Sequence, residues 1–540
     1  MAAARRSRRW RGRRSAALGA VAVAEQQGSA GVAARGDGDY DREAWLAAFQ
    51  NVEEEVCYTV ACEDLPKDLK GTYFRNSPAK FKVGEDQIMH PFDADGMVFA
   101  MTFDGSGQVH YRNRFVRTKG YCEELEAGRM IYRNQFSSKP GGWSANILDF
   151  RIKNLANTSV MSWGGRLLAL WEGGKPYELD GKSLATFGES NLAGALKDGD
   201  NFTAHPRYDA ANDRLVGFQY QPDPAADQTE LTFWEFGRGG FEVLNCVKQT
   251  VPGFGFFHDF VVTKNYYVLS YAPTSLSWKA LLGVAAGFKS MGEAIEFNGD
   301  QPGRILMIPR DGSEPIIVEV DSHFCFHFAN GFEDEDGRVI IDMVRVDTLM
   351  LGDGSSSSEP LWATADFQTI PKSLLWRYEV SPAGQWSRRQ LSDRPLDFPS
   401  IAPRLSGRRH RFAYCAAVAS TARAGPAQGL AKIDAEEGSA SETWMPEPHQ
   451  FLGESLFVPR CTPDAEAAKE DDGYVVGLLF DGRARRSELL VFDAQSVATG
   501  PICRVPLRGQ LPHGLHGCWS SDLVPSKESV AAAWSASPLP

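Results

Sequence analysis

Residues 511–519 read Leu-Pro-His-Gly-Leu-His-Gly-Cys-Trp and contain the histidine on which the fold prediction depends. Like His516 in this stretch, three histidines far upstream also stand alone among apolar residues, namely His205, His258 and His327. The four are separated by 53, 69 and 189 residues, whereas local zinc motifs place their ligands within a turn or two of one another. A fold that returns many times to one central axis could bring these histidines together.

Short runs of strand-forming residues, separated by Gly and Asp turns, follow one another through most of the chain. Examples are residues 98–103, 214–220, 266–271, 339–344 and 474–480. This pattern is typical of antiparallel hairpins, and meanders of this kind favour either a propeller or stacked sandwiches. The innermost strand of every propeller blade faces the same axis, so a propeller explains the distant histidines better. We therefore predict an all-β fold.

Composition limits the classes of protein to which the chain can belong. Length alone would allow several domains in 540 residues, but a propeller of this size is one domain. The net charge is −12, and residues 1–36 carry +7 of positive charge, which leaves −19 for the rest. Such an acidic body argues against nucleic acid as a partner. Nine cysteines without regular spacing favour reduced thiols.

The two ends of the chain differ in composition from the body. Residues 1–36 are rich in Arg and Ala, with no acid before Glu25, and resemble an organelle transit peptide. We expect a plastid destination; the mitochondrion, the cytoplasm and a merely disordered extension are the alternatives. Residues 40–524 are predicted to form a single propeller domain, and residues 525–540 a flexible tail.

One stretch interrupts the strand pattern. Residues 273–291 have apolar residues at helical spacing and are predicted to form a short helix. Its apolar side chains include Trp278, Leu281, Leu282 and Phe288. Either the helix packs across the propeller face, or it dips into a membrane surface as a peripheral contact.

A series of ordered motifs between about Leu65 and Trp519 resembles the carotenoid cleavage oxygenases, a family of non-haem iron enzymes. The motifs are Gly-Thr-Tyr-Phe-Arg-Asn-Ser-Pro (71–78), Phe-Asp-Ala-Asp-Gly-Met (92–97), Leu-Trp-Glu-Gly-Gly (170–174), Ala-His-Pro-Arg (204–207), Phe-His-Asp-Phe (257–260), Phe-His-Phe-Ala-Asn (326–330), Asp-Phe-Pro (397–399), Gly-Glu-Ser-Leu-Phe-Val-Pro-Arg (453–460), Asp-Asp-Gly-Tyr (471–474) and His-Gly-Leu-His-Gly (513–517). The resemblance implies a seven-bladed β-propeller, with a few short helices and loops forming a cap over the iron-bearing face.

The resemblance also implies that Fe(II) lies on the propeller axis, bound by four histidines: His205, His258, His327 and His516. His323 and His513 are nearby alternatives, but the family motifs select His327 and His516. Four neutral imidazoles leave the charge of the site near +2, which favours Fe(II) over Fe(III) and leaves positions open for O2.

Each metal-bound imidazole should donate its second N–H to an acceptor that fixes its orientation. The family uses carboxylates for three of them, and the matching residues here are Glu172, Glu454 and Asp397. Asp397 is one methylene shorter than the usual Glu. Either the backbone moves closer, or a water bridges the gap, or that histidine is held less rigidly.

The sequence therefore predicts an Fe(II)-dependent dioxygenase that cleaves a conjugated C=C bond of a carotenoid or apocarotenoid with O2, giving two carbonyl products. Phe257 and Phe326 are candidate walls of the apolar substrate tunnel, although both could equally be core residues. Within the family, the alternatives are a stilbene-cleaving dioxygenase and an O2-independent isomerohydrolase. Outside it, the alternative is a metal-free propeller that serves as a binding protein.

Overall fold

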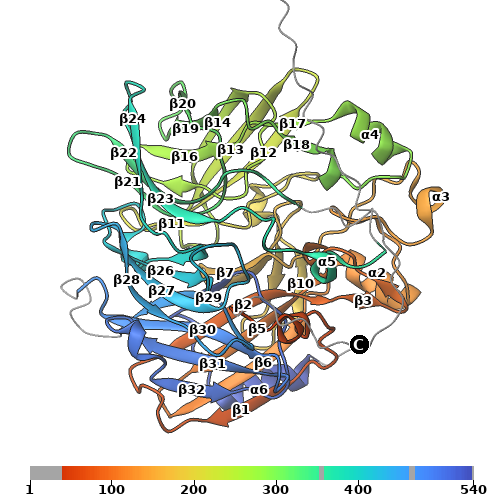
Figure 1. The fold of residues 1–540 in the computed structure, drawn as a ribbon. Helices are drawn as coiled ribbons and strands as arrows, with labels where there is room; N and C mark the ends of the chain where they lie inside the picture. Colours follow the sequence, from red (N-terminus) through yellow and green to blue (C-terminus); the bar gives the residue numbers. More distant parts are fainter. Residues whose placement is uncertain (1–38, 352–357, 461–468, 538–540) are drawn as a thin grey trace, which may run out of the picture.

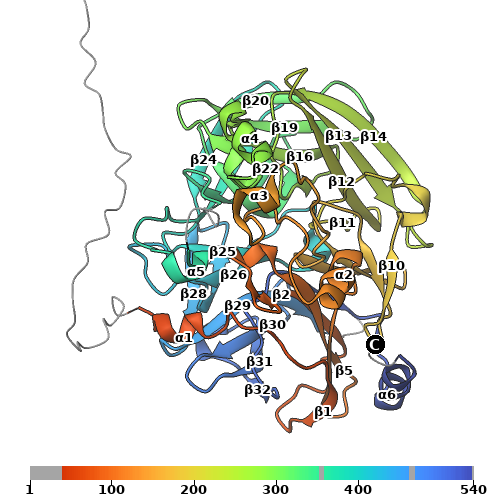
Figure 2. The ribbon, with the colours of Figure 1, turned by 90° about the vertical axis from the view of Figure 1, so that its right-hand side faces the viewer.

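Seven antiparallel sheets surround a central axis and form a β-propeller (Figures 1 and 2). The structure is a computed structural model, and it describes residues 39–351, 358–460 and 469–537. One sheet has five strands and the other six have four each. The seven-bladed all-β prediction is confirmed. The predicted targeting extension, residues 1–36, lies outside the described residues, so its role stays a prediction.

The strands follow the chain blade by blade. The first blade contains β1 (Cys57–Ala61), β6 (Gln108–Phe115), β5 (Asp95–Phe103), β2 (Gly71–Lys80) and β33 (Gly517–Ser520), and the second β7 (Ser159–Trp163), β8 (Arg166–Leu170), β9 (Tyr177–Leu179) and β10 (Thr186–Glu189). The third contains β11 (Arg207–Asp209), β12 (Arg214–Asp223), β13 (Gln228–Phe236) and β14 (Val243–Pro252), and the fourth β15 (Val261–Val262), β16 (Tyr266–Tyr271), β19 (Gly303–Pro309) and β20 (Ile316–Val320). The fifth contains β21 (Phe324–Glu333), β22 (Val339–Val346), β23 (Leu374–Val380) and β24 (Trp386–Gln390), and the sixth β25 (Leu396–Ser400), β26 (Phe412–Ala417), β27 (Gly429–Asp434) and β28 (Ser439–Trp444). The seventh contains β29 (Gln450–Pro459), β30 (Gly473–Asp481), β31 (Arg486–Asp493) and β32 (Cys503–Pro506). Outside the blades are two short strand pairs: β3 (Lys82–Val83) with β4 (Asp86–Gln87), and β17 (Thr274–Leu276) with β18 (Ile295–Phe297).

The last strand of the chain closes the ring. β33 pairs antiparallel with β2, with Tyr73 opposite Trp519 and Arg75 opposite Gly517. It becomes the innermost strand of the first blade and contacts β7 and β29 of the two neighbouring blades. Directly before it, the backbone N–H of Asn76 donates to the carbonyl oxygen of His516 at 2.9 Å. Ring closure therefore places His516 on the axis.

Apolar side chains between neighbouring blades form the core. Between the first and seventh blades, for example, Tyr73, Met101, Val476 and Leu489 are fully buried in one cluster. Burying a side chain of this size stabilises a fold by about 1.5–3 kcal/mol, and each blade has such a contact with its neighbours.

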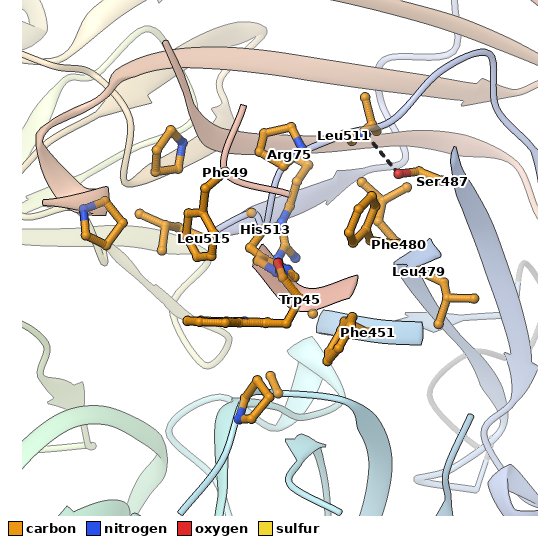
Figure 3. Close-up of a pocket in the computed structure, with 18 of the residues that line it drawn as sticks. Trp45, Phe49, Arg75, Phe451, Leu479, Phe480, Ser487, Leu511, His513 and Leu515 are labelled. Atoms are coloured by element: carbon orange, nitrogen blue, oxygen red, sulfur yellow. Dashed lines mark hydrogen bonds between the residues drawn. The ribbon is translucent and has the colours of Figure 1, made fainter. Parts of the chain in front are cut away.

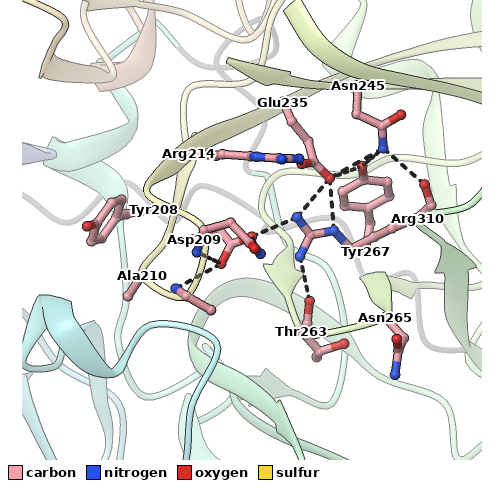
Figure 4. Close-up of polar contacts among 12 residues, drawn as sticks. Tyr208, Asp209, Ala210, Arg214, Glu235, Asn245, Thr263, Asn265, Tyr267 and Arg310 are labelled. Carbon is pink, nitrogen blue, oxygen red and sulfur yellow. Dashed lines mark hydrogen bonds and ion pairs between the residues drawn. The ribbon is translucent and has the colours of Figure 1, made fainter. Parts of the chain in front are cut away.

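A buried polar network also joins the third and fourth blades (Figure 4). The guanidinium of Arg310 donates to Asp209 Oδ2 at 2.6 Å, to Glu235 Oε1 at 2.8 Å and to the carbonyl oxygen of Thr263 at 2.9 Å. The hydroxyl of Tyr267 also donates to Glu235, at 2.7 Å. Buried charges are tolerated when they are paired in this way. The network fixes the two blades that carry His205 and His258.

The helices gather mainly on one face of the propeller, where α2, α3, α4 and α5 lie together in Figure 2. The helices are α1 (Arg42–Leu46), α2 (Lys119–Ala127), α3 (Gly142–Asn146), α4 (Trp278–Ala285), α5 (Leu361–Thr364) and α6 (Lys527–Ala536). In the described part of the chain, no helix has the length and hydropathy required to cross a bilayer.

The structure revises two expectations about local structure. The helix predicted over 273–291 is limited to α4. The residues before it form β17, which pairs with β18 beyond the helix, and Ser277 caps the first turn of α4 by accepting from the N–H of Ala280. The tail predicted to be flexible contains α6, which begins at the cap Ser526 and packs against β1. The guanidinium carbon of Arg114 lies 4.0 Å from the centre of the Trp534 ring, and this cation–π contact holds α6 in place.

Candidate metal centre

Each of the four predicted histidines lies on or beside the innermost strand of a different blade. His205 and His258 precede β11 and β15, His327 lies within β21, and His516 immediately precedes β33. These strands all face the axis, so residues far apart in the chain reach one point. The structure brings all four together.

The four imidazoles converge through their Nε2 atoms. Nε2 of His205 lies 2.9 Å from Nε2 of His258, and Nε2 of His327 lies 3.1 Å from Nε2 of His516. One nitrogen of each ring lies within 4.8 Å of the corresponding nitrogen of every other ring. Four imidazole nitrogens around one point, with no carboxylate among them, suit a divalent metal such as iron, zinc or copper. The group could therefore hold one metal ion.

Carboxylates lie behind three of the rings. Nδ1 of His258 is 2.6 Å from Glu172 Oε2, and Nδ1 of His516 is 2.8 Å from Glu454 Oε1. The Nδ1–H of His516 donates to Glu454, which fixes the tautomer and directs Nε2 inwards, and Glu172 stands in ion-pair contact with Nδ1 of His258. Arg75 donates in turn to Glu454 at 3.0 Å, so that carboxylate is itself held in place. Among the described residues, no carboxylate lies behind His205.

Asp397 makes direct contact in spite of its short side chain. Its Oδ1 lies 2.6 Å from Nδ1 of His327 and also accepts from the N–H of Phe398 at 2.8 Å. The strand has a bulge between Asp397 and Ser400, and Phe398 has a φ of 52°, in the left-handed region that non-glycine residues rarely occupy. Of the three possibilities raised by the sequence, the structure has the first: the backbone carries the carboxylate to the imidazole.

Burial keeps His205 and His516 neutral. It holds the pKa of His205 well below the usual value, with the neighbouring imidazoles adding to the effect, and it lowers the pKa of His516 to about 4 in spite of Glu454. These two rings are therefore neutral at neutral pH, which is the form that binds a metal. Burial opposes the charged form of His258 as well, but the charge and hydrogen bond of Glu172 outweigh it and raise that pKa.

The two alternative histidines lie elsewhere. His323 is buried between the hydroxyl of Ser270, 2.9 Å away, and the carbonyl oxygen of Asp321, 2.8 Å away. Nε2 of His513 donates to the carbonyl oxygen of Trp45 at 3.1 Å, and the two rings stack. Neither side chain joins the four-histidine group.

A cavity of about 190 Å³ opens onto three of the four histidines, His258, His327 and His516. Phe326 lines it, as expected, and lies beside His258 with ring centres 5.5 Å apart. The expectation for Phe257 is corrected: its ring is buried in the core between the third and fourth blades. Side chains alternate in direction along an extended chain, so Phe256, two residues before His258, faces the cavity instead.

Other residues that line this cavity were not singled out from the sequence. They are Phe92, Gln135, Phe136, Asn157, Thr158, Trp171, Leu351, Phe398 and Leu515. A usable signal was present for two of them, because Trp171 and Phe398 adjoin the carboxylates Glu172 and Asp397 in the sequence.

A second cavity, of about 210 Å³, adjoins the first (Figure 3). Phe92, Phe398 and Leu515 line both. Its walls are mainly aromatic, and Figure 3 shows the rings of Trp45, Phe49, Phe451 and Phe480 around His513. Both cavities are lined mainly by apolar side chains.

Comparison with known proteins identifies the family. The family model described as Retinal pigment epithelial membrane protein matches residues 49–521. The apocarotenoid-15,15'-oxygenase of Synechocystis is 37% identical over 491 residues, which cover 89% of this chain and 97% of that protein. The chain belongs to the carotenoid cleavage oxygenase family.

Further members support the assignment of an oxygenase. The carotenoid cleavage oxygenase 1 of Neurospora crassa is 28% identical over 84% of this chain and 86% of its own length. The crystal structure of the cobalt-substituted Synechocystis enzyme superimposes with a TM-score of 0.83 at 36% identity, and covers 89% of this chain and 99% of that one. This carotenoid cleavage oxygenase therefore shares both the fold and the class of its relatives.

Proposed function

We propose that this oxygenase uses Fe(II) and O2 to cleave a conjugated C=C bond of a carotenoid or apocarotenoid, giving two carbonyl products. The observation that carries the proposal is the convergence of four imidazole nitrogens within 4.8 Å at the wall of an apolar cavity. The names of the relatives, an apocarotenoid-15,15'-oxygenase among them, supply the substrate class.

The donor set fits iron. His205, His258, His327 and His516 would hold it through Nε2, and neutral imidazoles leave its positive charge uncompensated, which favours the ferrous state. Bound Fe(II) would supply the site at which O2 is activated. The carboxylates behind three rings keep their Nδ1 protons in place, and so keep Nε2 free as the ligand atom.

The remaining residues position the substrate. Phe256, Phe326 and Trp171 line the cavity beside the histidines and exclude water from it. Phe398 and Leu515 stand where the two cavities meet, so a rod-shaped polyene could lie past the histidines with one arm in each. The bond cleaved would be the one held nearest the four Nε2 atoms. A compact stilbene would occupy only part of this space.

Labelled oxygen tests the reaction directly. With ¹⁸O2, an apocarotenal substrate should yield an aldehyde product that carries the label, and turnover should stop when O2 is removed. Mass analysis of freshly quenched products measures the label before it exchanges with water. Unchanged turnover without O2 would instead assign the protein to the isomerohydrolases.

We also propose that an apolar patch places the enzyme on lipid. The patch consists of Trp143, Leu148, Trp278, Leu282 and Phe288, each more than half exposed. The patch comes from two segments, residues 143–148 and 278–288, and the rings of Trp143 and Phe288 stack between them. Exposed apolar side chains on an amphipathic surface helix commonly enter the headgroup region of a bilayer.

The patch lies beside the cavity. The N–H of Gly292, in the segment after α4, donates to the carbonyl oxygen of Gln135 at 2.9 Å, and a side chain at Gly292 would meet the ring of Phe136. Gln135 and Phe136 both line the cavity. Binding through the patch would therefore bring this wall of the cavity close to the bilayer in which a polyene dissolves.

Replacing Trp278 and Leu282 together by serine should weaken binding to vesicles and slow the turnover of substrates presented in them. The two side chains are 70% and 72% exposed, so the variant should fold and keep its metal. Leu281, which the sequence also suggested, is half buried and is left unchanged. Co-sedimentation with vesicles measures binding.

The matched control is Phe187→Ser, because Phe187 is also 70% exposed but lies on β10, away from the patch. It should bind vesicles as the unmodified protein does. If the double variant precipitates or loses its metal, these side chains are part of the core of the cap and not a lipid contact.

A further inference from the structure

Two cysteines meet at the outer rim of the propeller, where the first and last blades adjoin. Cys62 immediately follows β1, the outermost strand of the first blade, and Cys503 begins β32, the outermost strand of the seventh. Their Sγ atoms are 3.0 Å apart, although 441 positions separate them in the chain. The pair therefore lies at the edge of these two blades that is farthest from the propeller axis.

The surroundings hold the two thiols against each other. Cys503 is 2% exposed and belongs to the apolar cluster between the two blades, while Cys62 packs against that cluster and remains partly exposed. On the same rim, the N–H of Arg508 donates to the hydroxyl of Tyr58, a residue of β1, at 2.8 Å. The strands β1 and β32 therefore keep a fixed position relative to each other, and with them the two sulfur atoms.

We propose that Cys62 and Cys503 form a disulfide bond that fastens the first blade to the seventh when the protein meets an oxidant such as hydrogen peroxide. The sulfur atoms need to move from 3.0 Å to about 2.05 Å, the length of an S–S bond. Among the described residues, no other two cysteine thiols are in hydrogen-bond contact, so within this part of the chain the bond should form at this pair.

The chemistry balances with peroxide as the oxidant. The thiol of Cys62 attacks peroxide and becomes a sulfenic acid, with release of one water. The thiol of Cys503 then attacks that sulfur, the S–S bond forms and a second water leaves with the thiol proton. Both electrons removed from the thiols reduce the peroxide. Burial and the contact with Cys62 raise the pKa of Cys503, so the partly exposed Cys62 is the thiol that meets the oxidant first.

The bond would close the ring a second time. β33 already fastens the inner edge of the first blade through its pairing with β2, and the disulfide would fasten the outer edge. Closing a loop of several hundred residues removes much of the freedom of the unfolded chain, which is the main way in which a disulfide stabilises a fold.

Peptide mapping tests the proposal on the full-length protein. After treatment with peroxide and then alkylation, a non-reduced digest should contain one peptide pair that links Cys62 to Cys503, about 2 Da lighter than the two reduced peptides together. Dithiothreitol should abolish that pair. The oxidised protein should also melt roughly 2–6 °C above the reduced protein in scans at one fixed rate.

Two serine variants separate this bond from general oxidation. Cys62→Ser should lose both the linked peptide and the rise in melting temperature. Cys57→Ser removes a half-buried thiol from β1, the strand that precedes Cys62, and should behave as the unmodified protein does. Recovery of Cys62 and Cys503 on separate peptides after oxidation, either as alkylated thiols or as higher oxides, would overturn the proposal.

Discussion

Replacing His516 by alanine should leave the purified protein with little bound iron and no measurable cleavage of an apocarotenal. Its Nε2 lies 3.1 Å from that of His327, and its Nδ1 is held by Glu454, so alanine removes one of the four converging imidazoles. The variant would also leave Glu454 and Arg75 paired beside an empty space. Metal analysis of the protein and product mass spectra measure the two losses separately.

The control is His513→Ala, three residues earlier. His513 stacks on Trp45 and does not reach the four-histidine group, so this variant should keep its iron even if its melting temperature falls. Full activity in His516→Ala together with loss of iron in His513→Ala would reverse the assignment of the two histidines.

Asp397→Asn should lower iron retention or turnover by about 10–100-fold, the usual effect of removing a partner behind a metal ligand. The neutral amide cannot supply the charge that now faces Nδ1 of His327 at 2.6 Å, and its NH2 group repels the Nδ1 proton if it turns inwards. The iron dissociation rate into a chelator reports the loss of retention, and steady-state turnover reports the loss of activity.

Asp397→Glu distinguishes a lost charge from a lost fit. It restores the carboxylate but lengthens the arm by about 1.5 Å, one C–C bond, on a backbone that already bulges to bring the shorter acid close. It should therefore keep more iron than Asp397→Asn. If both variants retain iron and turnover like the unmodified protein, Asp397 has no part in orienting His327.

The sequence was sufficient for the features that depend on pattern and motif. Alternating strands predicted an all-β fold, the family motifs specified seven blades, and they selected His327 over His323 and His516 over His513. The comparisons and the structure bear out the family and the fold. The iron, the reaction and the membrane contact remain proposals.

Features that depend on the direction of a side chain in irregular backbone could not be predicted. Phe256 and Phe257 are adjacent and chemically identical, and only the conformation before β15 decides which one faces the cavity. The close approach of Asp397 depends on the positive φ of Phe398, and a phenylalanine in the sequence does not predict that conformation. The order of residues 527–536 depends on a contact between Trp534 and Arg114, more than four hundred positions apart.

The pairing of β33 with β2 has a consequence for the making of the protein. A ribosome that has released everything up to residue 510 has released three of the four histidines, but neither His516 nor the strand that holds it in place. The nascent chain can fold most of its blades and still lack a complete set of imidazoles. Metal competence would then arise only after β33 has been made, and a chain that stops at residue 510 would be an open, inactive arc.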